Sequence, residues 1–492
     1  MNGGKEASVV RLLDAWRCVA QLYGKEQWRV FFESGRFNNR LRTRQGYDLV
    51  GTARGQMIEA QVVGILDSFL SNRSNDFRDL VNASDLDAGL KHQLHFINRW
   101  KGWFVIKDKL TMRSGDVISE DTRRLARSIM RHVLSKHRKP DLSHIGMLID
   151  QRSIKLESSK KSSRHGWWLR MATLAKGKPI SIPLAHTERM EARAGVRALT
   201  LQVNQDRITG AIHFGVLTNC TQAFQESRQD YRPRTETIAL DVGLCTLLAT
   251  SDGGLLGQRW KERLEWHDRR ITRLTAQLQR QGLKPNSSVR YRTYVQALRG
   301  WVASEVGRTL NRLVHTHAPA EIVTELLDFR APALSRRLNR LIGKFGKGCL
   351  EAKLKDLEER FGIALVKVNP AYTSQLCNSC GYVDKRNRKE QSTFSCLFCG
   401  SKRHADGNAA CNLRDRRSAP AEDCKRHRKG ILTDLVEGFN KAHPRPRVRS
   451  TGAKARAADP RLSNPHFRGW ALEVGQSGDS VTTRHSDSRM IL

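Results

Sequence analysis

The chain has 492 residues, 39% of them hydrophobic, which is enough for about three domains with hydrophobic cores of their own. It carries 86 lysine and arginine residues against 49 aspartate and glutamate residues, a formal net charge of +37 at pH 7. This charge favours nucleic acid as a partner, while the lack of any run of about 18 apolar residues argues against a membrane-spanning helix.

The first 140 residues have the pattern of amphipathic helices. Apolar side chains recur at three- and four-residue steps, as at Leu12, Trp16, Val19 and Tyr23. This spacing places them on one face of a helix, and proline is nearly absent from the region. We therefore predict a helical domain over residues 1–140.

Short strands are predicted next. Residues 167–172, 180–184 and 198–203 are rich in β-branched and aromatic side chains, and turns that contain lysine or glycine separate them. Such runs indicate strands of a small sheet. We predict a small, basic β-barrel over residues 141–235.

A mixed α/β pattern begins near Thr237. One apolar strand ends on Asp241 and another ends on Glu325, with two long helical patterns between them. A further helix and the strand 363–368 follow. Strands that alternate with helices indicate an α/β domain, which we predict over residues 236–370.

Four cysteines have the spacing of a zinc ribbon. Cys377 and Cys380 form one Cys-x-x-Cys pair, Cys396 and Cys399 form a second, and a glycine follows each pair. Two such turns present four thiolates to one tetrahedral zinc ion, and all four positions are filled by protein, so the site is predicted to be structural. We predict the ribbon over residues 371–403.

A third acidic residue, Asp406, follows the ribbon at the start of a helical pattern. Each of Asp241, Glu325 and Asp406 could alone be a turn residue or a helix cap. Together they suit phosphodiester hydrolysis with two divalent ions, because Mg²⁺ prefers oxygen ligands. Beyond the segment 404–415, residues 416–492 lose their periodicity, and we predict a basic tail that is mostly disordered.

Several short segments of the sequence resemble motifs of one protein family. The run Ile-Ala-Leu-Asp-Val-Gly around Asp241 resembles the first motif of RuvC-type nucleases, and Ile-Val-Thr-Glu-Leu-Leu around Glu325 resembles the second. The run Asp-Gly-Asn-Ala-Ala-Cys-Asn-Leu from Asp406 resembles the third. With the ribbon between the second and third acids, residues 236–415 resemble TnpB proteins and the compact type V CRISPR effectors.

The resemblance implies a multidomain α+β fold. It comprises a helical recognition domain, a wedge-like β-barrel and an RNase H-like RuvC domain, with the zinc ribbon inserted in the last of these. It also implies catalytic magnesium on Asp241, Glu325 and Asp406, and structural zinc on the four cysteines.

The implied activity is that of an RNA-guided, magnesium-dependent DNA endonuclease that cuts beside a short adjacent motif with a single active site. Its partners would be a guide RNA, the target duplex and the displaced single strand. A prokaryotic, cytoplasmic location with association to the nucleoid is expected.

Two alternatives remain open from the sequence. One is an RNA-guided DNA-binding protein that represses without cutting, which the presence of all three acids disfavours. The other is a DDE-type transposase, which would share the fold and the metal chemistry but need no guide. The ribbon between the second and third acids argues against it.

Overall fold

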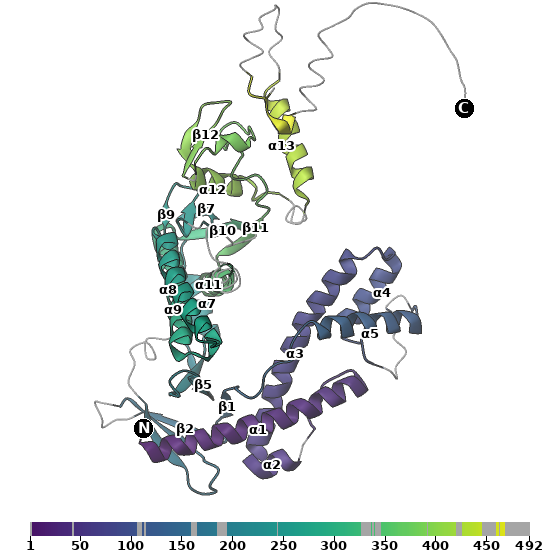
Figure 1. Cartoon of the computed structure of the whole chain (residues 1–492), viewed down its shortest axis with the longest axis vertical. Coiled ribbons are helices and arrows are strands. Elements are labelled where there is room, and N and C mark those ends of the chain that lie inside the picture. Colours follow the sequence, from purple (N-terminus) through teal and green to yellow (C-terminus); the bar gives the residue numbers. More distant parts are fainter. Residues whose placement is uncertain are drawn as a thin grey trace, which may run out of the picture. The chain divides into compact units, whose positions relative to one another are not determined.

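The computed structural model describes residues 2–41, 44–105, 111–112, 115–158, 165–184, 194–243, 245–325, 336, 339, 346–390, 392–419, 426–444, 459–461 and 463–467. The chain divides into two compact units, residues 1–223 and 224–492 (Figure 1). Within the described residues, no helix combines the length and the apolar character that a bilayer crossing requires.

Long helices open the first unit. They are α1 (Gly3–Ser34), α2 (Arg44–Val50), α3 (Thr52–Ala83), α4 (Ala88–Arg99) and α5 (Glu120–Ser135). The apolar stripe predicted for the first helix is confirmed, because Leu12, Trp16, Val19 and Tyr23 are fully buried. This stripe lies in the core of the unit, where α1 packs against α2 and α3.

The predicted short strands are also confirmed, as two antiparallel sheets. Leu169 and Val203 from these sheets join the same core as the helices, whereas closure into a barrel stays a prediction. One sheet has the order β1-β5-β6 and the other β2-β3-β4. The strands are β1 (Met147–Asp150), β2 (Ile154–Ser158), β3 (Trp167–Met171), β4 (Ile180–Leu184), β5 (Val196–Gln205) and β6 (Ile212–Asn219).

The second unit is built on a mixed sheet, and α7 (Thr221–Asp230) leads into it. The strand order is β11-β10-β7-β8-β9, in which β11, β10 and β7 are parallel and β8 and β9 are antiparallel. The strands are β7 (Thr235–Asp241), β8 (Leu248–Thr250), β9 (Leu255–Leu256), β10 (Pro319–Glu325) and β11 (Ala364–Val368).

Helices cover both faces of this sheet. Ile238 and Ile322 pack into a core with α8 (Trp260–Arg280), α9 (Val289–His317) and α11 (Lys347–Phe361), and a short 3-10 turn, η1 (Pro285–Ser287), joins α8 to α9. On the other face, Ala239 and Val323 form a small cluster with Leu413 of α12 (Ala405–Asp415). Strands that are buried on both faces have continuous apolar sequences, and this is the case for β7 and β10.

The ribbon region contains β12 (Thr393–Ser395), which pairs with β13 (Lys402–His404), and the 3-10 turn η3 (Lys385–Asn387). The prediction of disorder after residue 415 is wrong for α13 (Arg428–Ala442) and η5 (Pro465–Phe467). Apolar residues of α13, ending at Phe439, recur at helical spacing and pack on the ribbon together with Phe467. This stripe offsets the cost of ordering a segment rich in charge. The rest of the predicted tail lies outside the described residues, except where the ranges given above include it.

Candidate metal centre

Two of the predicted acids stand at the carboxyl ends of adjacent parallel strands. Asp241 is the last residue of β7, Glu325 is the last residue of β10, and the two strands pair in parallel. Strand side chains alternate between faces, so Asp241 shares the face of Ala239 and Glu325 shares the face of Val323. That is the face covered by α12.

The third acid comes to this face from α12. Asp406 lies in the first turn of the helix, and the N-cap position belongs to His404, so Asp406 is not a capping residue. Gly243, just after β7, lies beside this carboxylate. A Cβ at position 243 would clash with the Thr246 carbonyl oxygen at 2.8 Å, whereas its 3.8 Å distance from Asp406 Oδ2 would be an ordinary contact. The glycine is therefore needed for the turn that follows β7.

The electrostatics of the three acids are those of buried carboxylates that lie near one another. Burial, followed by the charges of Glu325 and Asp406, holds the pKa of Asp241 well above its ordinary value, while Arg388 acts in the opposite direction. Burial alone raises the pKa of Glu325 to about 7. Carboxylates that are buried near one another ionise only if positive charge is supplied. Oxygen ligands of this kind suit a hard divalent ion such as Mg²⁺.

Arg388 is the residue of this site that sequence reasoning missed. Its Nη2 donates to Asp406 Oδ1 at 2.8 Å, and both side chains are largely buried. It comes from the ribbon, between the two cysteine pairs. Nothing in the sequence separates it from the rest of the 86 lysine and arginine residues, because its role depends on the fold of the ribbon.

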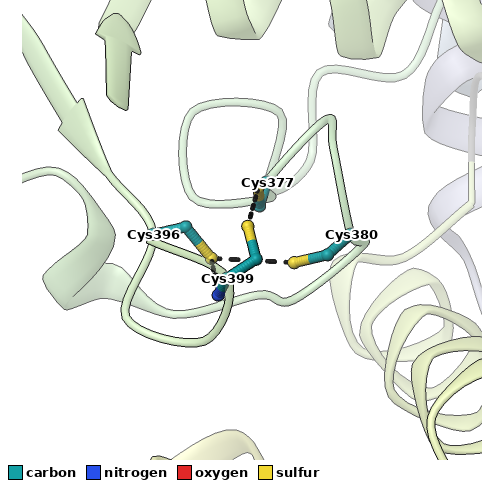
Figure 2. Close-up of side chains that lie close together, drawn as sticks. All are labelled: Cys377, Cys380, Cys396 and Cys399. Atoms are coloured by element: carbon teal, nitrogen blue, oxygen red, sulfur yellow. Dashed lines mark hydrogen bonds between the residues drawn. The ribbon is translucent and has the colours of Figure 1, made fainter. Parts of the chain in front are cut away.

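The four predicted zinc ligands come together. Their sulfur atoms all lie within 4.8 Å of one another, with 3.7 Å between Cys377 and Cys399 and 3.6 Å between Cys380 and Cys396 (Figure 2). A tetrahedral zinc ion with Zn–S bonds of ~2.3 Å places sulfurs about 3.8 Å apart. The thiols therefore fit zinc. Among the described residues, Asp241, Glu325 and Asp406 do not form a second group of this tightness.

The glycines after each pair make the two ligand turns possible. Gly381 and Gly400 have φ values of 77° and 72°, a left-handed conformation that other residues adopt at a cost. Their amides donate to the carbonyl oxygens of Cys377 and Cys396 at 2.8 and 3.0 Å. The predicted tight turns around the sulfurs are confirmed.

Two asparagines tie the first ligand turn to α12. Asn408 Nδ2 donates to the Leu376 carbonyl at 2.7 Å, and Asn408 Oδ1 accepts from the Asn378 amide at 3.1 Å. Asn412 Nδ2 donates to the carbonyls of Leu376 and Thr373, both at 2.8 Å. The i, i+4 spacing of the asparagines places both on one face of α12, so the backbone that carries Cys377 is fixed to the helix that carries Asp406.

Side chains from the C-terminal region complete the core of the ribbon. Tyr382 is fully buried, stacks on Phe398 and Phe467, and contacts Phe439. Its hydroxyl accepts a hydrogen bond from Asn464 Nδ2 at 2.9 Å. Sequence reasoning missed this contribution, although the apolar stripe of α13 was a signal for it.

Comparison with known proteins found one family model, several relatives and several solved structures that are similar to this chain. Residues 348–413 match the family model described as "Cas12f1-like, TNB domain". The CRISPR-associated endodeoxyribonuclease Cas12f1 of Sulfoacidibacillus thermotolerans is 44% identical over 64 residues, which is 13% of this chain and 15% of that protein. A candidate RNA-guided DNA endonuclease, InsQ of Escherichia coli, is 25% identical over 234 residues, which is 43% of this chain and 58% of InsQ.

Among solved structures, the cryo-EM structure of a Cas12f1–sgRNA–target DNA complex matches with a TM-score of 0.38 and 12% identity, over 71% of this chain and 81% of that one. The sequence alignments with Cas12f1 and InsQ each span less than two thirds of the relative's length. The match to the family model, residues 348–413, includes the ribbon and α12.

Proposed function

Because this chain is a relative of the TnpB and compact type V CRISPR effector proteins, we propose that it is an RNA-guided, magnesium-dependent DNA endonuclease. The observation that supports the proposal is that Asp241, Glu325 and Asp406 lie near one another on one face of the mixed sheet, in a chain that also carries a four-cysteine ribbon. We assign this sheet to the RNase H-like fold of RuvC-type nucleases.

The domain roles follow the same proposal. Residues 1–140 would be the recognition domain and residues 141–235 the wedge. Residues 236–370 would be the RuvC-like nuclease, and residues 404–415 its third motif, reached through the ribbon at residues 371–403. The helix α7 at the end of the second segment would link the wedge to the nuclease.

The three acids would hold the catalytic magnesium. Bound divalent ions of this kind polarise a phosphodiester and activate water for attack. The sheet fixes the backbone of Asp241 and Glu325, because both residues belong to strands that are paired with their neighbours. Asp406 depends on the position of α12, which packs on the sheet and is also tied to the ribbon through Asn408 and Asn412.

Arg388 would act as a positioning residue at the same centre. Its guanidinium holds Asp406 by a charge-assisted hydrogen bond of 2.8 Å, and such bonds are stronger than neutral ones. It also favours the ionised form of Asp241, because its positive charge lowers the pKa of that carboxyl. Arg388 would hold the acids ready for the cation and keep Asp406 from turning away.

The excess of positive charge supports the nucleic-acid part of the proposal. A net charge of +37 suits a protein that holds backbones while base pairing with a guide RNA reads the target sequence. One nuclease centre would then have to cut both DNA strands in turn.

The test is cleavage of a target by the full chain purified with co-expressed RNA. The target lies beside a randomised flanking motif, and Mg²⁺ is present. We expect cleavage by the wild type and by Glu358→Ala, which removes an exposed carboxylate from α11, and at least ~10³-fold slower cleavage by Asp241→Ala. Absence of cleavage in all three would refute the proposal.

The same assay separates the two alternatives. Guide-dependent binding without any Mg²⁺-dependent product would indicate a repressor-like protein. Strand joining that survives removal of the RNA with RNase would indicate a transposase.

A further inference from the structure

The two long helices between the first and second acids carry a basic hollow that residues of both helices line. The inner side of this hairpin, with Leu264 and Leu298, is buried against the sheet. The hollow has a volume of about 330 Å³, at the lower end of the ~300–1,000 Å³ typical of ligand sites. Its lining includes Trp266, Arg269, Arg270, Arg273, Arg290 and Tyr294.

The spacing of these residues in the sequence explains why they line one hollow. Trp266, Arg269, Arg270 and Arg273 recur at steps of three and four residues along α8, so they form one stripe of that helix. Arg290 and Tyr294 are four residues apart on α9 and face the stripe across the hollow. Four guanidinium groups thus surround one space.

Aromatic rings hold the arginine at the centre in a fixed orientation. The guanidinium carbon of Arg270 lies 4.6 Å from the centre of the Trp266 ring and 5.0 Å from that of Tyr294. Its Nη2 also donates to the Tyr294 hydroxyl at 2.6 Å. On Trp266, Arg263 makes a second contact at 4.5 Å. A guanidinium stacked on aromatic rings keeps its N–H groups in plane and loses less entropy when it binds an anion.

The positive charge of the hollow is only slightly compensated. Glu265 reaches Arg269 at 3.8 Å, but in the part of the chain that the structure describes no carboxylate forms an ion pair with Arg270, Arg273 or Arg290. Arg270 and Arg290 instead contact the neutral Tyr294 hydroxyl, which lowers the pKa of that group. Cations assembled without counter-charges repel one another, and a bound polyanion removes that repulsion.

We propose that this hollow, the α8–α9 basic pocket, binds backbone phosphates of a nucleic-acid strand at a site separate from the nuclease centre. The proposal rests on the proposed function in that it takes nucleic acid as the partner. The arginine fork suits phosphate oxygens, which it can contact by two parallel hydrogen bonds. The strand could be RNA or DNA, since both offer the same phosphates.

The experiment measures binding by the full chain in an Asp241→Asn background, without added magnesium. No chelator is used, because it would strip zinc from the ribbon. The probes are labelled 20-nucleotide RNA, single-stranded DNA and DNA duplex. The pocket variant is Arg273→Glu with Arg290→Glu. Its matched control is Arg280→Glu with Arg312→Glu, which changes the same charge at exposed positions of α8 and α9 outside the pocket.

We expect the pocket variant to bind at least one probe ~10-fold or more weakly than the control does. The slope of log affinity against log salt should also fall by about 1.4, as expected for two lost contacts to a single strand. A loss confined to RNA would identify the RNA as the ligand, and a loss confined to DNA would identify the target. Circular dichroism checks that both variants keep their helices.

Equal affinity and equal salt slope of the two variants on all probes would overturn the proposal, because the effect would then be one of net charge alone. This result is distinct from failure of the proposed function. The binding assay does not depend on cleavage. A protein that binds nucleic acid without cutting it would still reveal whether the pocket variant binds more weakly than the control.

Discussion

Replacement of Asn408 by alanine tests whether the ribbon and the nuclease centre are mechanically coupled. The Asn408 side chain is fully buried and joins α12 to the backbone on either side of Cys377. In the alanine variant, the Leu376 carbonyl keeps its bond from Asn412. The Asn378 amide loses the hydrogen-bond acceptor that Asn408 Oδ1 provides.

The magnitude follows from this one unsatisfied group. A buried donor without a partner costs about 1–3 kcal/mol, so we take roughly 2 kcal/mol for the local attachment of the ligand turn to α12. At 1.4 kcal/mol per factor of ten, the attached state becomes about 25-fold less favoured. Zinc release to a competing chelator should accelerate by a similar factor, and cleavage should slow because Asp406 moves with α12.

Zinc release from the full chain is followed with a chromogenic chelator, and cleavage is measured on the same preparation. Asn311→Ala, at an exposed position of α9, is the matched control. Asn408→Asp is a second variant, which keeps an acceptor for the Asn378 amide but sets a carboxylate against the Leu376 carbonyl. It should release zinc at least as fast as Asn408→Ala. If Asn408→Ala releases zinc and cuts DNA at the rates of Asn311→Ala, the coupling does not exist.

Three further predictions concern the ribbon, its C-terminal cover and the helical hairpin. Cys380→Ser should lower the zinc bound per chain by more than roughly half at micromolar zinc and slow cleavage; full zinc content with full activity, by elemental analysis and the cleavage assay, would contradict this. Phe439→Ala should destabilise the ribbon by about 3–5 kcal/mol, seen as faster proteolysis near the cysteines than in the exposed-site control Leu283→Ala. Burial lowers the pKa of His267 to about 4, so its contribution to stability is complete above pH ~6.5 and is lost as the pH falls towards 4. Between pH 7.5 and pH 5 the wild type should therefore lose about 2 kcal/mol of unfolding free energy that His267→Leu does not lose, as measured in urea; identical pH dependence in the two proteins would refute the assignment.

The features that could be predicted from the sequence are those set by local patterns. The stripe of α1, the strands that end on Asp241 and Glu325, and the Cys-x-x-Cys turns with their glycines each depend on a short run of residues. Arg388 and Asn408 could not be predicted in this way, because their partners lie 18 residues away or on a different element.

The error over the C-terminal region has a different physical cause. Its high content of charge, serine and proline predicts disorder over most of the segment. A few apolar residues are nevertheless enough to order α13 and η5, because they pack on the ribbon. Phe439 and Phe467 are each almost completely buried against Tyr382. Composition averages over the segment and hides such a stripe, whereas folding depends on where the apolar side chains fall.

The C-terminal cover of the ribbon, formed by α13 and the segment around Phe467, also affects the position of the proposed nuclease centre. The matched family model ends at residue 413, before Phe439, Asn464 and Phe467, so these contacts belong to the part of the chain beyond the match. Phe439 and Phe467 share one core with Tyr382, Val383 and Phe394 of the ribbon, whereas zinc would hold the two ligand turns. With the cover in place, Tyr382 is fixed next to Cys380, whose carbonyl oxygen also lies 3.1 Å from His443 Nε2. The ribbon is thus held by zinc on one side and by α13 on the other. The ribbon in turn orients Arg388 and α12. Loss of either support should therefore displace Asp406 more than Asp241 or Glu325, because the last two lie on strands of the sheet.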